Sequence, residues 1–179
     1  NEKLDEYYLH LFAVEQPDLN MDNPEVREEV KDIMRFWLDM GVDGFREDVI
    51  TFISKKEGLP SSPYWFPVAT GIEKYMHGPH LDEYLLEFKN DVLSKYDCFT
   101  VGEGPLITPE KVLRFVTEDD TQVLKTMFSF DHLEADCFMT DWIKIPFNLK
   151  KMKKCYQKWY DAMNGKGWHT LYLENHDHP

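Results

Sequence analysis

The sequence predicts an α/β fold, in which a parallel sheet is covered by helices, and three observations lead to that prediction. Amphipathic helical segments alternate with short apolar strands along the chain of 179 residues. Charged side chains, Asp48, Glu103 and Asp177, fall at or just past the carboxyl ends of three predicted strands. No glycine-rich phosphate-binding loop follows these strands, which argues against a doubly wound open sheet. We therefore predict part of a (β/α)8 TIM barrel.

The first predicted helix begins at Asn23, a good N-cap residue, with Pro24 at the first helical position. Apolar residues then recur at helical spacing until Gly41, which ends the run. Residues 44–50 have the pattern of a short strand. Residues 58–79 are rich in proline, serine and aromatic side chains, so we expect a long irregular loop, whose length favours a functional role.

The rest of the chain repeats this alternation. The expected segments are a helix over 81–94, a strand over 98–102, a helix after Thr108, a strand over 123–130, a helix over 149–163 and a strand over 168–173. Thr108 followed by Pro109 is typical of a helix start, and Asn164 followed by Gly165 is typical of a helix end.

The composition excludes several classes of protein. The chain has 20 basic and 33 acidic residues, a formal net charge of −13, which argues against binding to nucleic acid or an anionic membrane. With 42% hydrophobic and 15% aromatic residues it can bury a core, and its apolar runs are too short for a membrane span. Cys98, Cys137 and Cys155 are odd in number and far apart, so we expect a reducing, cytoplasmic location.

Arg46 and Asp48 lie two residues apart on a predicted strand, so their side chains share a face. A guanidinium beside a carboxylate keeps that carboxylate ionised, as a nucleophile or electrostatic stabiliser requires. The alternative is a purely structural ion pair at the end of a strand.

Glu103 lies between two glycines, with apolar Phe99 and Val101 close by in the sequence. A carboxyl group in such surroundings, near a second carboxylate, tends towards a raised pKa and a general-acid role. The alternative is a solvated glutamate in a loop.

Asn175, His176 and Asp177 place an amide, an imidazole and a carboxylate directly after a strand. Such a set binds sugar hydroxyls or, less in keeping with the spacing, a metal ion. One ionised carboxylate, one protonated carboxyl and a third polar cluster are the parts of a retaining glycosidase.

These segments resemble the alpha-amylase family, glycoside hydrolase family 13, and within it the oligo-1,6-glucosidase and alpha-glucosidase group. The four segments that carry the resemblance are Gln16-Pro17-Asp18-Leu19-Asn20, Gly44-Phe45-Arg46-Glu47-Asp48-Val49, Val101-Gly102-Glu103 and Leu173-Glu174-Asn175-His176-Asp177. They stand in the order found in the family, and further similarity over 7–12 and 36–38 extends the resemblance to nearly the whole chain.

The resemblance implies a role for each motif residue. Asp48 would be the nucleophile that forms a covalent glycosyl-enzyme, and Glu103 the acid and base. Asp177 would bind two ring hydroxyls, with His176 beside it, and Arg46 would orient Asp48. The implied partner is an oligosaccharide, and we predict neither a cofactor nor a metal ion.

Four positions near these motifs bear on specificity or depart from the family pattern. Val49 follows the nucleophile where valine often accompanies a preference for alpha-1,6 links, which suggests isomaltose-type substrates. Glu47 stands where the family usually has an apolar residue that, by strand alternation, faces the surrounding helices, and a buried acid there would need a partner. Gly104 and His178 replace a larger residue and a glutamine, and both changes border the substrate pocket.

The resemblance also implies a division of the chain. Residues 1–20 would be the tail of an inserted second domain, and residues 21–179 a partial TIM-barrel catalytic domain covering about strands four to seven. Because a complete barrel needs about 250 residues, we expect a fragment that is inactive alone and self-associates through open sheet edges.

The predicted function is therefore that of a retaining glycoside hydrolase that releases glucose from alpha-linked, preferably alpha-1,6-linked, oligosaccharides. Within the same family, a trehalose-phosphate hydrolase or a sucrose isomerase shares these motifs. From another class, a non-catalytic glucosidase-like subunit of a transporter is the alternative, although such proteins typically lack the carboxylates that this sequence retains.

Overall fold

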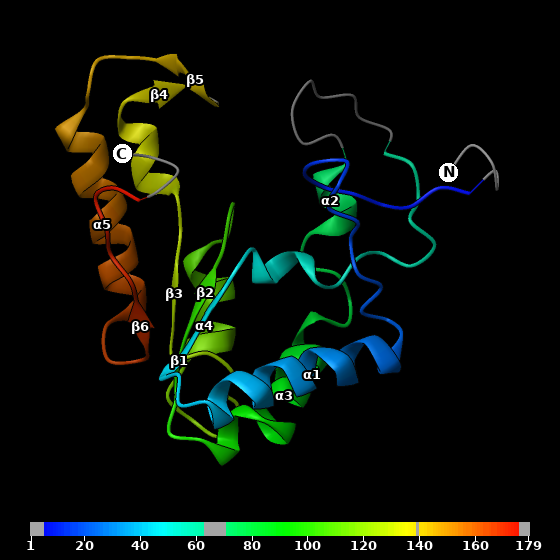
Figure 1. Ribbon diagram of the computed structural model, residues 1–179. Coiled ribbons are helices and arrows are strands. Elements are labelled where there is room, and N and C mark those ends of the chain that lie inside the picture. The colour runs from blue at the N-terminus through cyan, green and yellow to red at the C-terminus, as the bar shows by residue number, and fades with distance from the viewer. Residues whose placement is uncertain (1–5, 63–70, 139, 176–179) are drawn as a thin grey trace.

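The computed structural model describes residues 6–62, 71–138 and 140–175. Its main sheet contains β1 (Gly44–Glu47), β2 (Phe99–Glu103), β3 (Thr126–Phe128) and β6 (Trp168–His169), in the order β1-β2-β3-β6. All neighbouring strands are parallel, and each pairs with the strand before it in this sheet (Figure 1). A parallel sheet with helices between its strands confirms the predicted fold class.

Helices connect the strands. They are α1 (Pro24–Asp39), α2 (Ile72–Tyr75), α3 (Leu81–Asp91), α4 (Pro109–Val116) and α5 (Leu149–Met163), with short 3₁₀ turns η1 (Ile50–Phe52), η2 (Leu93–Lys95) and η3 (Asp131–Ala135). A small antiparallel pair, β4 (Cys137–Phe138) and β5 (Thr140–Lys144), precedes α5 and was not predicted. Figure 1 shows this pair near one end of α5, away from α2 and the segment that leads to α1.

Most helix ends follow the sequence signals, although the helix predicted over 81–94 ends at Asp91. The Asn23 side chain accepts a hydrogen bond from the Glu25 backbone N–H at 3.0 Å, as an N-cap does. The helix predicted over 149–163 has those bounds, and its N-cap Asn148 accepts from Lys151 N–H at 3.0 Å. Among its described residues, the loop predicted over 58–79 contains one helical turn, α2, which its proline-rich composition does not predict.

Three strands are shorter than predicted because pairing stops early, whereas β2 keeps the predicted length and is shifted by one residue. The strand expected over 44–50 ends at Glu47, whose partner in β2 is Gly102. Two residues later Val49 adopts a left-handed conformation, with φ 37° and ψ 43°, and the chain enters η1. The strands expected over 123–130 and 168–173 are likewise reduced to β3 and β6.

Residues alternate between the two faces of this sheet, and the register aligns them across strands. The inner face carries Arg46, Glu103 and Phe128. The outer face, covered by helices, has a continuous row of four residues in register: Glu47, Gly102, Met127 and His169. Buried side chains of α3, α4 and α5 pack on this outer face around Met127, which has no exposed surface.

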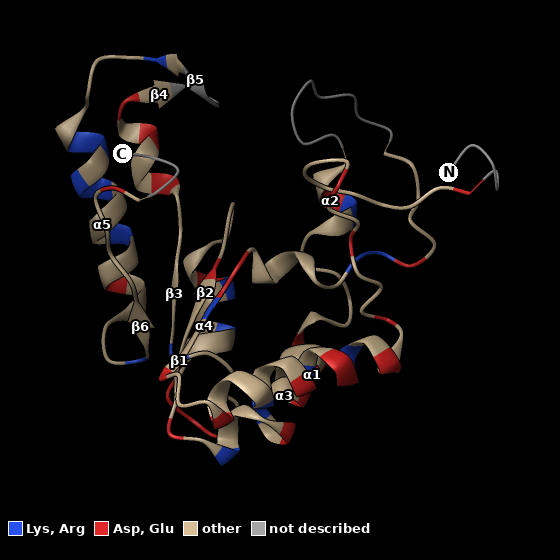
Figure 2. Ribbon diagram, viewed as in Figure 1, with Lys and Arg blue, Asp and Glu red and all other residues tan. Residues whose placement is uncertain are grey.

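Charge is distributed unevenly over the helices (Figure 2). Lys31 on α1 is buried and forms ion pairs with Glu28, Glu87 and Asp91, which ties α1 to α3.

Within the part of the chain that the structure describes, no helix is long and apolar enough to cross a bilayer.

Candidate active site

Asp48 is the first residue after β1 and Arg46 is the last inward-facing residue of that strand. The Arg46 guanidinium forms an ion pair with the Asp48 carboxylate, as the spacing predicts. The Asp48 side chain retains 69% of its accessible surface, so this carboxylate is open to a ligand. The arrangement leaves Asp48 both oriented and accessible.

Glu103 ends β2, the neighbouring strand, and only 5% of its surface is exposed. Its Oε2 atom accepts a hydrogen bond from Arg46 Nη2 at 2.6 Å and another from the Val49 backbone N–H at 3.1 Å. The alternative of a solvated loop glutamate is therefore wrong. A single guanidinium contacts the carboxylates of Asp48 and Glu103 and brings the two strand ends together.

The surroundings of Glu103 explain its protonation behaviour. Burial raises the pKa of its carboxyl above the ordinary glutamate value, and the nearby Asp48 carboxylate adds to the rise. The Val49 N–H and the charge of Arg46 act in the opposite direction. The balance favours a carboxyl that holds its proton to higher pH than an exposed glutamate, which suits a general acid.

Two aromatic side chains at the site were not anticipated from the sequence. Phe128 is the β3 partner of Glu103, and its ring centroid lies 5.9 Å from the Arg46 guanidinium carbon. Tyr172, just after β6, packs edge-on against Phe128 at 5.5 Å. Burial raises the Tyr172 pKa, and the charge of Glu103 raises it further. The sequence signal that could have indicated aromatic residues at the site is the run of Phe128, Ser129 and Phe130 at the end of a predicted strand.

The turn after Asp48 is held by the segment that precedes α1. Lys55 forms a 2.6 Å ion pair with Asp18 and donates to the Phe52 carbonyl at 2.7 Å. Phe12 stacks on Phe52, with centroids 6.4 Å apart. The motif that includes Asp18 thus contacts the loop that follows the predicted nucleophile.

The predicted sugar-binding residues His176 and Asp177 lie outside the described residues. The description ends at Asn175, six residues after the end of β6. The positions of these two side chains therefore stay a prediction.

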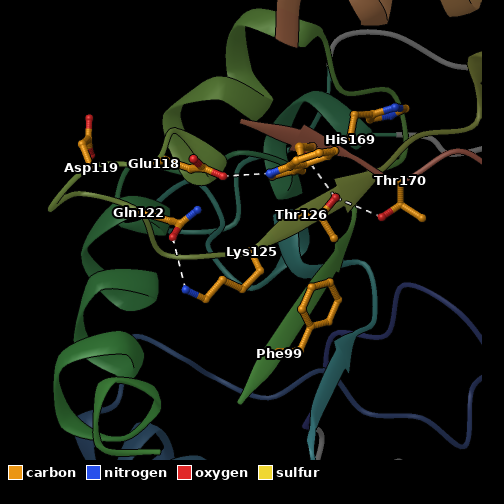
Figure 3. A pocket seen from close by; sticks show the side chains of 9 residues that line it. Phe99, Glu118, Asp119, Gln122, Lys125, Thr126, His169 and Thr170 are labelled. Atoms are coloured by element: carbon orange, nitrogen blue, oxygen red, sulfur yellow. Dashed lines mark hydrogen bonds between the residues drawn. The ribbon is translucent and has the colours of Figure 1, made fainter. Parts of the chain in front are cut away.

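A cavity of about 750 Å³ lies at the opposite end of the strands. It is lined by Phe99, Thr126 and Trp168, each the first residue of its strand, and by the loop before β3 (Figure 3). Its polar groups bind one another: Trp168 Nε1 donates to Glu118 at 2.8 Å. Since Asp48 and Glu103 stand at the carboxyl ends, this cavity has no part in their chemistry.

A known protein family matches the chain over its whole length. The family model described as "Alpha amylase, catalytic domain" matches residues 1–179. The chain belongs to the alpha-amylase family.

Relatives within the alpha-amylase family are similar over the whole chain. The oligo-1,6-glucosidase of Parageobacillus thermoglucosidasius is 46% identical over 184 residues, covering 100% of this chain and 32% of that protein. An alpha-glucosidase of Schizosaccharomyces pombe is 40% identical over 185 residues, covering 99% and 31%. The chain therefore spans about a third of the length of these relatives.

Solved structures of alpha-amylase family enzymes have the same fold. The trehalose-6-phosphate hydrolase of Bacillus licheniformis superimposes with a TM-score of 0.88 at 40% identity, covering 97% of this chain and 31% of that one. The isomaltulose synthase of Klebsiella sp. LX3 gives 0.85 at 35% identity, covering 95% and 30%. Both results support the prediction that the sheet is part of a barrel.

Proposed function

We propose that the protein to which this chain belongs is a retaining alpha-glucosidase acting on alpha-linked oligosaccharides. The observation that carries the proposal is the contact of Arg46 with both Asp48 and Glu103 at adjacent strand ends. One carboxylate is exposed and paired, and the other is buried with a raised pKa. Two carboxyl groups with opposed environments are what double displacement at a glycosidic bond requires.

In the proposed mechanism, Asp48 attacks the anomeric carbon while Glu103 gives its proton to the departing glycosidic oxygen. The carbon–oxygen bond to the leaving sugar breaks as the ester bond to Asp48 forms. Glu103, now ionised, takes a proton from water, and the water oxygen displaces Asp48 to release glucose. Arg46 orients Asp48, and Asp177 and His176 bind ring hydroxyls of the sugar.

A preference for alpha-1,6 links is proposed from Val49. It follows Asp48 directly and its backbone N–H binds Glu103, so Val49 lies beside both predicted catalytic carboxyl groups. The named oligo-1,6-glucosidase relatives support the same choice. Val49→Thr should raise the ratio of maltose to isomaltose hydrolysis, and an unchanged ratio would remove this part of the proposal.

A second candidate of the same class is favoured by the structural neighbours. Trehalose-6-phosphate hydrolase and isomaltulose synthase share the fold at TM-scores of 0.88 and 0.85. Product analysis with isomaltose, trehalose 6-phosphate and sucrose separates the three activities. Rapid release of glucose from trehalose 6-phosphate, or isomerisation of sucrose, would overturn the alpha-glucosidase proposal.

The decisive experiment supplies the rest of a barrel. The matching segment of the P. thermoglucosidasius oligo-1,6-glucosidase is replaced by this chain, which the 46% identity makes reasonable. We expect the chimera to hydrolyse isomaltose and Asp48→Asn to abolish turnover while leaving the circular dichroism spectrum unchanged. A folded D48N chimera that keeps most of its activity would disprove the nucleophile assignment. A folded but inactive chimera with Asp48 intact would favour a non-catalytic relative.

Three further predictions concern the molecule as a whole. We propose a cytoplasmic location, supported by the reduced thiols of Cys98 and Cys155. We propose that the boundary near residue 20 separates an inserted domain from the barrel.

β1 and β6 are the edges of the described sheet, and we propose that isolated copies associate through them. Sedimentation velocity would show a single monomeric species if the last proposal is wrong.

A further inference from the structure

Glu47 lies next to the predicted nucleophile Asp48 but on the opposite face of the sheet. Its register partner is Gly102, whose own partner is the fully buried Met127. A Cβ atom at Gly102 would lie 2.7 Å from Leu124 and 3.2 Å from Ile50, so this row faces the apolar layer beneath the helices. Glu47 therefore turns its buried Oε1 atom towards this apolar layer, while the residue as a whole is half-buried.

The carboxyl group of Glu47 is poorly compensated there. Its Oε1 atom is buried, and the described residues provide no hydrogen-bond partner for it. Burial raises the pKa of Cys98, which lies just before β2, and the charges of Asp97 and Glu47 raise it further. The charge of Lys125 lowers it. Between the covering helices, the buried Lys31 is already engaged by three carboxylates. Desolvation raises the pKa of Glu47 to about 8.

At the opposite end of the same row, His169 is also held in its neutral form. His169 in β6 stacks on Trp159 of α5, with ring centroids 3.9 Å apart and planes 8° apart. Desolvation lowers its pKa to about 4. A row with a carboxylic acid at one end and a neutral imidazole at the other carries no charge between those two values.

We propose that Glu47 is a positioning residue, held as a neutral acid in the outer row, and that its ionisation displaces the end of β1 and misaligns Asp48. The displacement follows from geometry, because pairing of β1 ends at Glu47 and its partner Gly102. An ionised carboxylate favours fuller contact with water than the buried Oε1 atom has, and the move that provides it would carry Arg46 and Asp48 with it. The consequence for catalysis rests on the proposed function, whereas the consequence for stability does not.

The sign of the pH effect follows from linkage. Glu47 ionises near its ordinary value of about 4.3 in the unfolded chain but near 8 in the folded one. Between these values the unfolded state releases a proton that the folded state keeps, so the folded state loses stability as pH rises. The loss levels off above the folded-state pKa, where both states are ionised.

The first test measures thermal unfolding midpoints of the protein from pH 5 to pH 9 for wild type and Glu47→Gln. We expect E47Q to gain at least about 4 °C over wild type near pH 8.5, and less near pH 5. Glu29→Gln removes the same charge from an exposed position of α1 and should follow the wild-type curve. Parallel wild-type and E47Q curves would overturn the proposal.

A second measurement covers the case in which E47Q misfolds. Carbon-13 NMR of labelled glutamate carboxyls in the wild-type protein follows Glu47 directly, with its resonance assigned by its absence in E47Q or Glu47→Met. We expect a midpoint near pH 8, and a midpoint below pH 5 would overturn the proposal.

The catalytic consequence is read in the active chimera. The ratio of kcat/KM at pH 6 to that at pH 9 should be smaller in E47Q than in wild type by about tenfold. If unfolding midpoints shift as expected but this ratio is unchanged, Glu47 is structural and the positioning role is overturned. An inactive chimera would count against the proposed function alone, because the stability test needs no activity.

Discussion

The inner and outer faces of the sheet treat their titratable groups in opposite ways. On the inner face, the buried Glu103 is met by the Arg46 guanidinium and the Val49 N–H. On the outer face, the buried Oε1 of Glu47 has no donor among the described residues. Desolvation raises the pKa of both carboxyls, but on the inner face it is opposed by a charge and a hydrogen bond.

This difference shows what distinguishes a carboxyl group suited to catalysis from one that is merely buried. Desolvation that no donor among the described residues opposes keeps a carboxyl group neutral, as for Glu47. A partner that stabilises the ionised form allows the group to change its protonation state during a reaction. The contrast can be tested from either face of the sheet.

Among the changes that test this contrast, the largest effect is expected from Glu103→Gln in the chimera. An amide cannot supply a proton, so kcat/KM for isomaltose should fall by about 10²–10⁴-fold. The loss should be much smaller for a nitrophenyl glucoside, whose leaving group needs no proton. Equal losses with both substrates would show that Glu103 is not the general acid. The carboxyl group of the inner face would then have no more part in proton transfer than that of the outer face.

A smaller effect is expected from Arg46→Met, which removes the opposing charge from the inner face. The pKa of Glu103 should rise further, because the positive charge that lowers it is gone. We expect kcat/KM to fall by about 10–100-fold and its alkaline limb to move to higher pH. Arg35→Met, which removes an ion-paired arginine of α1, is the matched control and should leave the profile in place. An unmoved limb in R46M would contradict the assignment.

The smallest effect is expected from Gly102→Ala in the outer row. The added methyl group would meet Leu124 at 2.7 Å and Met127 at 3.2 Å, so the free energy of unfolding should fall by about 1–3 kcal/mol. Denaturant unfolding checks this value. Combining G102A with Leu124→Ala should reduce the cost of the glycine change, since the two side chains compete for one space. Additive losses would mean that the outer layer is not closely packed here.

Much of the fold could be predicted because its signals are local. Asn23 and Pro24 begin a helix through their own backbone and side-chain preferences, and Gly165 ends one with φ 70°. The placement of Asp48 and Glu103 at neighbouring strand ends followed from the parallel sheet. The lengths of three strands were wrong because pairing depends on a partner far away in sequence. Alternation alone does not reveal where the pairing stops.

The finer geometry of the site was beyond the sequence for a similar reason. Val49 is β-branched and yet left-handed, a conformation such residues rarely adopt, and only this turn directs its N–H to Glu103. Phe128 reaches Arg46 through the register of β2 and β3, which no local pattern fixes. For Glu47, alternation did predict an outward side chain, and only the structure revealed a buried oxygen without a donor among the described residues.

The order of the strands has a consequence for how the chain folds during synthesis. Because each strand of the main sheet pairs with the strand made just before it, every new strand meets a template that has already left the ribosome. The β1 and β2 pair, which carries Arg46, Asp48 and Glu103, can therefore assemble before β6 is translated. The two carboxyl groups would meet early, while the residues after β6 are still to come.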